Sequence, residues 1–314
     1  MSKSKRSKPR KFKLVVTALL LLSSVGLALA GLVLSGYFAH QAIRLSQNAQ
    51  VWVAKGKISH AIVDLTVASW ISPTNHQAIQ QLGDLYLLEN RPDDAVQALK
   101  RLPKGESGLQ IASLQRQMGE LAQSIKTLDD LMKGNPTAGL LTSKSQVQLE
   151  QGSANDAVVT SEQALSYAQD SRTQLQLGLA YAVGEHDDKL VTLIASVTAP
   201  ETLQALKQAQ SGKIPLAHVL YATGLLRSSE RILVAQSNLN PTDHTLLGHI
   251  ELILSANNHT KLAEAVAHLE KATHQDPANQ EAHRLLQQAY EEQGNVDGST
   301  HQAELVRELE TGKI

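Results

Sequence analysis

The sequence predicts an all-α fold, in which stacked helix pairs follow a single apolar N-terminal helix. Three observations lead to this prediction. Alanine, leucine and glutamine, which favour helices, dominate the 314 residues, and aromatic residues make up 3%. A long uncharged segment lies near the N-terminus. Beyond it, one pattern of a small residue, a leucine and a proline recurs along the chain.

The first 38 residues predict a basic cytoplasmic tail, residues 1–13, and a transmembrane signal-anchor helix, residues 14–38. The tail carries seven basic side chains and no acidic one, and residues 14–38 carry no charge. A helix needs roughly 20 apolar residues to cross a bilayer core, so this segment is long enough to span it with some tilt. Because flanking basic residues stay in the cytoplasm, we expect the rest of the chain outside it, on the cytoplasmic membrane.

A cleaved signal peptide is the alternative interpretation of this segment. Ala28-Leu29-Ala30 is similar to a small-residue cleavage site, and cleavage after Ala30 would release a secreted adaptor. The apolar stretch favours an anchor, because it is already about 14 residues long before Ala28 and continues beyond that site. A soluble core helix is disfavoured, since such a helix would have a polar face.

The remainder of the chain is acidic and lacks cysteine. Removing the seven basic residues of the tail from the total of 29 leaves 22 against 30 acidic residues, a net charge near −8. A nucleic-acid groove needs clustered Lys and Arg, so we expect no nucleic-acid partner. The absence of cysteine excludes thiolate catalysis, disulfides and thiol-ligated metals.

A repeat runs through the body of the chain. Four segments place a leucine four residues and a proline twelve residues after a small residue. They are Ala61/Leu65/Pro73, Ser124/Leu128/Pro136, Ser229/Leu233/Pro241 and Ala265/Leu269/Pro277. Each proline ends a helix. Leu82-Gly83 with Tyr86, and Leu177-Gly178 with Tyr181, indicate the other helix of the unit, where glycine permits a close helix approach.

These residues resemble the tetratricopeptide repeat, whose 34-residue signature has Leu-Gly and Tyr on a first helix, then Ala, then Pro. The resemblance implies a right-handed α-solenoid of about seven repeats over residues 39–311, with repeats that contact only their neighbours. The spacing is irregular around residues 140–215. The aligned small-residue positions are Ala61, Ala95, Ser124, Ala157, Leu190, Ser229, Ala265 and Ser299.

The resemblance also implies a concave face, lined by the first helix of each pair, that binds protein or peptide partners. On two pairs this face consists of amide, acidic and apolar side chains, which suits an extended or helical peptide. The Lys/Asn clamp with which some relatives bind a C-terminal carboxylate is absent. The candidate partner-binding residues are Gln77, Gln80, Asp84, Leu87 and Leu88 on one pair, and Arg172, Leu175 and Leu179 on the other.

We expect no catalytic, cofactor-binding or metal-binding residues, because no nucleophile elbow, P-loop or His-Glu-x-x-His motif occurs. Seven of the 12 histidines lie in the last 71 residues without i,i+4 spacing, and we interpret them as solvent-facing. Asp93-Asp94 and Asp187-Asp188 are interpreted as helix N-terminal residues. An enzyme with an unrecognised site is the alternative of another class. The sequence thus predicts a membrane-anchored, extracytoplasmic scaffold or assembly factor, and leaves its partner and oligomeric state open.

Overall fold

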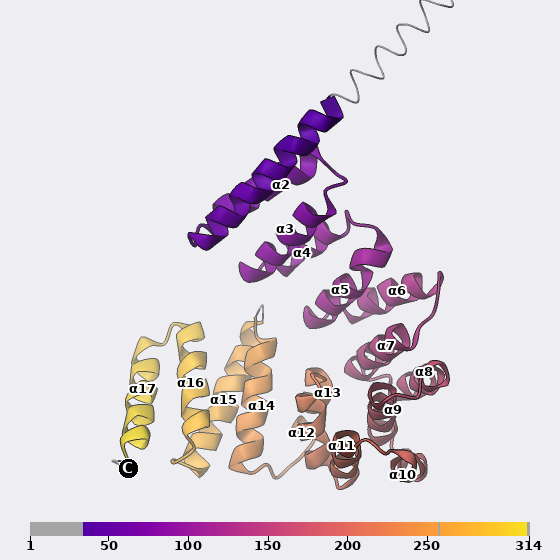
Figure 1. Cartoon of the computed structure of the whole chain (residues 1–314). Helices are drawn as coiled ribbons and strands as arrows, with labels where there is room; N and C mark the ends of the chain where they lie inside the picture. The colour runs from indigo at the N-terminus through magenta and orange to yellow at the C-terminus, as the bar shows by residue number, and fades with distance from the viewer. Residues whose placement is uncertain (1–33, 257, 313–314) are drawn as a thin grey trace, which may run out of the picture. The chain divides into compact units, whose positions relative to one another are not determined.

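The computed structural model describes residues 34–256 and 258–312, which divide into two compact units, one ending at Met118 and the other beginning at Gly119 (Figure 1). The described residues are helical apart from turns and loops, with no β-strand among them. No helix in this part of the chain is both long and apolar enough to cross a membrane. The tail at 1–13 and most of the expected span at 14–38 lie outside the described residues.

The first unit contains two helix pairs and one further helix. Residues 34–54 are helical and pack against α2, and α3 pairs with α4. Asn75 caps α3 by accepting a hydrogen bond from the Ala78 N–H, and Pro92 stands in the first turn of α4, as expected for helix starts. The helices are α2 (Ile58–Ile71), α3 (His76–Leu88), α4 (Pro92–Leu99) and α5 (Lys104–Gln117).

The core of the first unit is built from small residues at helix crossings. Ala42, Ala49, Ala61 and Ala78 are completely or almost completely buried, so the helices approach closely. Arg101, in the turn after α4, connects that turn to α2, because its guanidinium donates to the Ser69 carbonyl at 2.6 Å and to Ser69 Oγ at 2.9 Å.

The second unit contains twelve helices among its described residues. Glycines in the left-handed conformation end α7 and α16, at Gly152 and Gly294, as is common at helix C-termini. The helices are α6 (Leu121–Met132), α7 (Ala138–Gln151), α8 (Ala154–Tyr167), α9 (Ser171–Val183), α10 (Asp187–Ser196), α11 (Pro200–Gln210), α12 (Lys213–Ala222), α13 (Leu226–Val234), α14 (Pro241–Leu254), α15 (His259–Gln275), α16 (Gln280–Gln293) and α17 (Val296–Thr311).

The repeat positions found in the sequence are packing positions in the structure. All eight aligned residues are buried, at 0–9% exposure. Seven of them, from Ala61 to Ser299, are the fourth residue of their helix, and Ala265 lies deeper within α15. A Cβ on Gly83 would lie 3.1 Å from Leu99, and one on Gly248 would lie 2.6 Å from Leu269. The first helix of a pair therefore meets the leucine four residues beyond the small position of the second.

The alignment of Leu190 with the small residues is wrong. By the pattern above, Gly178 on α9 should meet Ile194 on α10, four residues after Leu190. Instead, a Cβ on Gly178 would lie 2.2 Å from Leu206 on α11. Thr202, four residues before Leu206, is the buried small residue of this pair. Helix α11 thus provides the crossing leucine for α9, although α9 also packs against α10, which lies between them in the sequence.

The expectation that repeats contact only their neighbours is also wrong in the second unit. Helix α13 packs against α7 as well as against α12 and α14. Arg231 donates to the backbone carbonyls of Leu149 at 3.3 Å and Glu150 at 2.8 Å, in the last turn of α7. In return, Glu150 Oε2 accepts the backbone N–H of Arg227, in the first turn of α13, at 3.0 Å. These bonds satisfy helix-end groups that otherwise lack partners.

Candidate functional site

The five candidate residues of the first unit lie along α3, at spacings that keep them near one face of the helix. Gln77, Asp84 and Leu88 are exposed, Leu88 at 67%, and Gln80 and Leu87 are half-buried. The Gln80 amide donates to Asp84 Oδ1 at 3.3 Å and to Gln110 Oε1 on α5 at 2.9 Å. The structure therefore brings these side chains together on an accessible surface that continues toward α5.

A pocket of about 250 Å³ adjoins this surface. Asp84 belongs to both the pocket and the α3 row. The Gln81 Oε1 atom is buried at the pocket and has no hydrogen-bond partner among the described residues. The lining comes from the helix at 34–54, from α2 and from α3, and it consists of Ala49, Gln50, Val53, Leu65, Gln81, Asp84 and Leu85.

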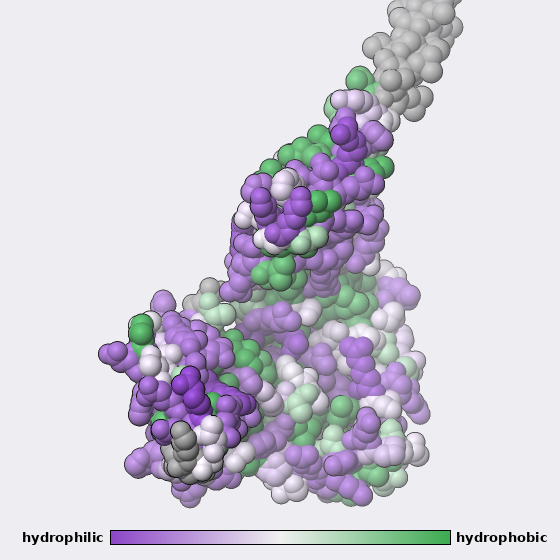
Figure 2. Space-filling model, turned by 60° about the vertical axis from the view of Figure 1, so that its left-hand side comes forward, coloured by the Kyte–Doolittle hydropathy of each residue, from purple (hydrophilic) through white to green (hydrophobic). Residues whose placement is uncertain are grey.

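Sequence reasoning missed the contribution of the first helix to this pocket. Gln50 stands 34 residues before Asp84, which is one repeat length, so it occupies the equivalent position of the preceding pair. Counting back one repeat length from the α3 residues would have identified Gln50 from the sequence. The same first pair exposes several apolar side chains, among them Val51, Val63 and Trp70, and Figure 2 shows apolar surface in this region.

The three candidate residues of the second unit are placed differently. Arg172 is exposed near the start of α9, and Leu175 is half-buried against the core. Leu179 is 1% exposed and belongs to the core, because α9 is packed between α7 and α11. Leu179 therefore offers no surface to a partner, and the candidate face in this unit reduces to the first turns of α9.

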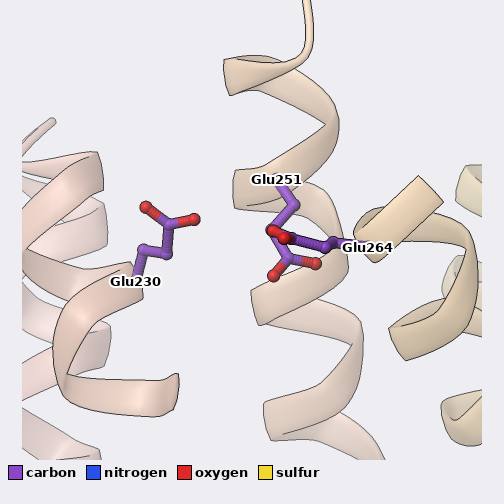
Figure 3. Close-up of side chains that lie close together, drawn as sticks. All are labelled: Glu230, Glu251 and Glu264. Carbon is purple, nitrogen blue, oxygen red and sulfur yellow. The ribbon is translucent and has the colours of Figure 1, made fainter. Parts of the chain in front are cut away.

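A cluster of carboxylates, which the sequence analysis did not predict, joins three helices of the second unit (Figure 3). Glu230 on α13, Glu251 on α14 and Glu264 on α15 each place an oxygen within 4.8 Å of the others. Lys261 pairs with Glu230 and, at 2.6 Å, with Glu264. Glu251 is 1% exposed, and burial raises its pKa to about 8. The three residues lie on separate helices at unequal spacings, so no sequence motif marks them.

A histidine pair, in which His244 is buried and His268 is partly buried, lies beside this cluster. The rings of His244 and His268 stack, with their Nδ1 atoms 3.1 Å apart, and His268 Nε2 is 3.8 Å from Glu251 Oε1. Burial, with the nearby Lys271 and His244, lowers the pKa of His268 to about 4. His283 is also buried, with Nδ1 2.6 Å from Gln302 Oε1. The interpretation of the C-terminal histidines as solvent-facing is therefore wrong for His244 and His283.

No family model matches the sequence, and no curated protein matches it. Many solved structures are similar to this chain, and three of them are as follows. A tetratricopeptide repeat protein from Parabacteroides merdae is 15% identical over 80% of this chain and 99% of its own, with a TM-score of 0.48. The Naa15/Naa10 complex bound to HypK-THB is 14% identical over 86% of this chain and 53% of its own, with a TM-score of 0.43. MamA from Desulfovibrio magneticus is 20% identical over 56% of this chain and 96% of its own, with a TM-score of 0.29.

The structural neighbours thus include tetratricopeptide repeat proteins. The argument for the class of this chain comes from its own helices, namely the pairs, the buried small residues and the glycine–leucine crossings. Together they define an all-helical protein built from repeated helix pairs, whose crossings resemble those of the tetratricopeptide repeat.

Proposed function

We propose that this chain is a membrane-anchored protein-interaction scaffold, and that the surface along α3 binds a segment of a partner protein outside the cytoplasm. The observation that carries the proposal is the α3 row, with exposed Gln77, Asp84 and Leu88 beside a pocket of about 250 Å³. A mostly apolar recess bordered by a few polar groups is the usual form of a binding groove.

The chemistry of the surface indicates what the partner segment presents. The pocket has room for one apolar side chain, and the unpaired Gln81 Oε1 is an acceptor for a donor of the partner. The Asp84 carboxylate favours N–H donors or a basic side chain nearby. We therefore expect an extended or helical peptide with an apolar anchor, flanked by donors.

Site-specific photo-crosslinking in membranes tests this surface. A photoreactive residue at Gln77 or Leu88, both exposed on α3, should give crosslinks to a discrete partner band. The same residue at Gln97, exposed on α4 of the same helix pair, is the matched control and should give little of that band. Equal crosslinking from both helices would place binding elsewhere.

The membrane anchor is supported by the sequence. Seven basic residues precede an uncharged segment of 25 residues, so the N-terminus should stay in the cytoplasm. A reporter fused after Ile314 should be active only if it works outside the cytoplasm. Activity of a strictly cytoplasmic reporter at that position would contradict the proposed topology.

A secreted adaptor is the second candidate, favoured by the Ala28-Leu29-Ala30 pattern. The mass of the mature protein distinguishes the two. A chain that retains residues 1–30 is anchored, whereas a chain that begins at Gly31 has been released by cleavage.

A further inference from the structure

The strongest unassigned feature is the carboxylate cluster of Glu230, Glu251 and Glu264. It lies where the irregular segment around α10–α13 meets the regular pairs α14/α15 and α16/α17. Figure 3 shows the three side chains pointing toward one another from separate helices. Their ligand oxygens all lie within 4.8 Å of one another. Two oxygens on opposite sides of a Ca²⁺ ion, each at about 2.3–2.6 Å, are themselves about 4.6–5.2 Å apart, so the spacing suits one ion.

The charges in the cluster do not balance. When all three carboxylates are ionised, they face the single ammonium of Lys261, which donates hydrogen bonds to Glu230 and Glu264. The Oε2 atom of Glu251 is buried and has no hydrogen-bond partner among the described residues. Lys271 and His268 also influence Glu251, yet neither donates a hydrogen bond to it within the described chain. A buried carboxylate oxygen without a donor is costly, and a cation beside it removes that cost.

We propose that Glu230, Glu251 and Glu264 form a binding site for a divalent cation, and that the cation is Ca²⁺. The donors are carboxylate oxygens, which hard cations prefer. Three carboxylates with one lysine carry a formal charge of −2, which a divalent ion neutralises. Ca²⁺ tolerates irregular geometry, whereas Mg²⁺ requires near-octahedral ligands at about 2.0–2.1 Å and dehydrates reluctantly, so three carboxylates from three separate helices favour Ca²⁺.

Lys261 is the internal competitor for the site. Its ammonium lies between two of the three ligands, and its side chain is 27% exposed, so it can move toward solvent when an ion binds. The bound ion would then connect α13, α14 and α15 at once. Because these helices belong to successive pairs, Ca²⁺ would stiffen the junction between the irregular segment and the C-terminal pairs.

Calcium titration of the full-length chain, purified in detergent and stripped with a chelator, tests the proposal. Calorimetry should show one Ca²⁺ site, and Ca²⁺ should raise the melting temperature more than Mg²⁺ at equal concentration. Glu251→Gln should weaken Ca²⁺ binding at least tenfold and remove the thermal shift. Lys261→Met should strengthen binding, because it removes the competing ammonium. Glu162→Gln, which changes an exposed carboxylate paired with Lys189, is the matched control and should behave as wild type.

Hydrogen exchange of the wild-type chain tests the Ca²⁺ site even if a variant folds poorly. Ca²⁺ should slow exchange in peptides from α13, α14 and α15 of the wild-type chain, and it should leave α3 and α4 of the first unit unchanged. The proposal is overturned if wild type binds no Ca²⁺ at millimolar concentration, or if Glu251→Gln binds it as tightly as wild type. Weaker binding by Lys261→Met would overturn the competitor role of that lysine.

Discussion

The α3/α4 crossing and the α9/α11 crossing have the same glycine–leucine contact. They differ in which helix provides the leucine. In both, a glycine on the first helix faces a fully buried leucine, Leu99 in one and Leu206 in the other. In the first unit the leucine comes from the next helix along the chain. In the second it comes from the helix after next, and α10 is inserted between. The crossing is thus a local property of the repeat, whereas the helix that provides the leucine is set by the tertiary structure.

The two regions also differ in how far their contacts reach. Arg101 and Ser69, on either side of the α3/α4 pair, are 32 residues apart, about one repeat length. Arg231 and the Glu150 carbonyl in the second unit are 81 residues apart, more than two repeat lengths. Nearest-neighbour repeats unfold in parts, whereas a long-range contact couples distant helices. The following predictions test this difference.

Gly178→Val should have the largest effect on stability. A Cβ at this position would lie 2.2 Å from Leu206 Cδ2, and Leu206 is completely buried, so the added side chain must displace packed atoms. We expect the free energy of unfolding to fall by about 3 kcal/mol, the upper end of the range for overpacked cores. Chemical denaturation of the full-length chain measures it. Adding Leu206→Ala to Gly178→Val should cost less than the sum of the two single changes. Simple additivity would contradict the crossing.

Arg231→Met should have the next largest effect. The change removes two charge-assisted hydrogen bonds to the last carbonyls of α7. We therefore expect the free energy of unfolding to fall by about 1.5–3 kcal/mol. Hydrogen exchange should increase at residues 146–151, about 80 residues from the substitution. Arg284→Met, which loses an exposed pair with Glu310, is the control and should cost less than about 1 kcal/mol. Faster exchange confined to α12–α14 would mean that α13 does not couple to α7.

The sequence predicted the helix pairs well because their signals are local. Buried small residues such as Ala61 and Ala95, the prolines beyond the second helices and Gly83 each act within one repeat. Leu190 misled the alignment because an inserted amphipathic helix has the same local pattern as a repeat helix. The α3 surface follows from helical spacing and was predictable. Burial of Leu179 and the convergence of Glu230, Glu251 and Glu264 depend on how distant helices pack, which spacing does not encode.

The stability of the second unit should fall as pH rises from about 6.5 to 8. Glu251 has a folded pKa of about 8, above its ordinary value of 4.5, so its stabilising contribution is complete below pH 4.5 and is lost as pH rises from there to 8. His268 has a folded pKa of about 4, below its ordinary value of 6.5, so its contribution to stability is lost as pH falls below 6.5. The two effects on stability therefore oppose each other below pH 6.5, and that of Glu251 dominates above it. The fall should be on the order of 1 kcal/mol.

Chemical denaturation at several pH values, with chelator present to exclude cations, measures this dependence. Glu251→Gln should remove the decline above pH 6.5, because glutamine does not titrate. Glu162→Gln should retain it, because that carboxylate is exposed and its pKa is lowered by Lys189. A decline that persists in Glu251→Gln would assign the effect to another group.

Gly83→Ala should have the smallest effect and sharpens the comparison between the two crossings. The new Cβ would lie 3.1 Å from Leu99 Cγ and Cδ2, which is tight but needs a shift of only a few tenths of an ångström. Alanine also favours the helix over glycine by about 1 kcal/mol, and this gain offsets part or all of the packing cost. We therefore expect a change within about 1 kcal/mol, measured by chemical denaturation beside Gly178→Ala as the matched substitution. Gly178→Ala has the same propensity gain but a 2.2 Å contact, so it should be clearly more destabilising. Equal effects at the two sites would mean that the α9/α11 crossing is looser than the α3/α4 crossing and that α11 can move away from α9.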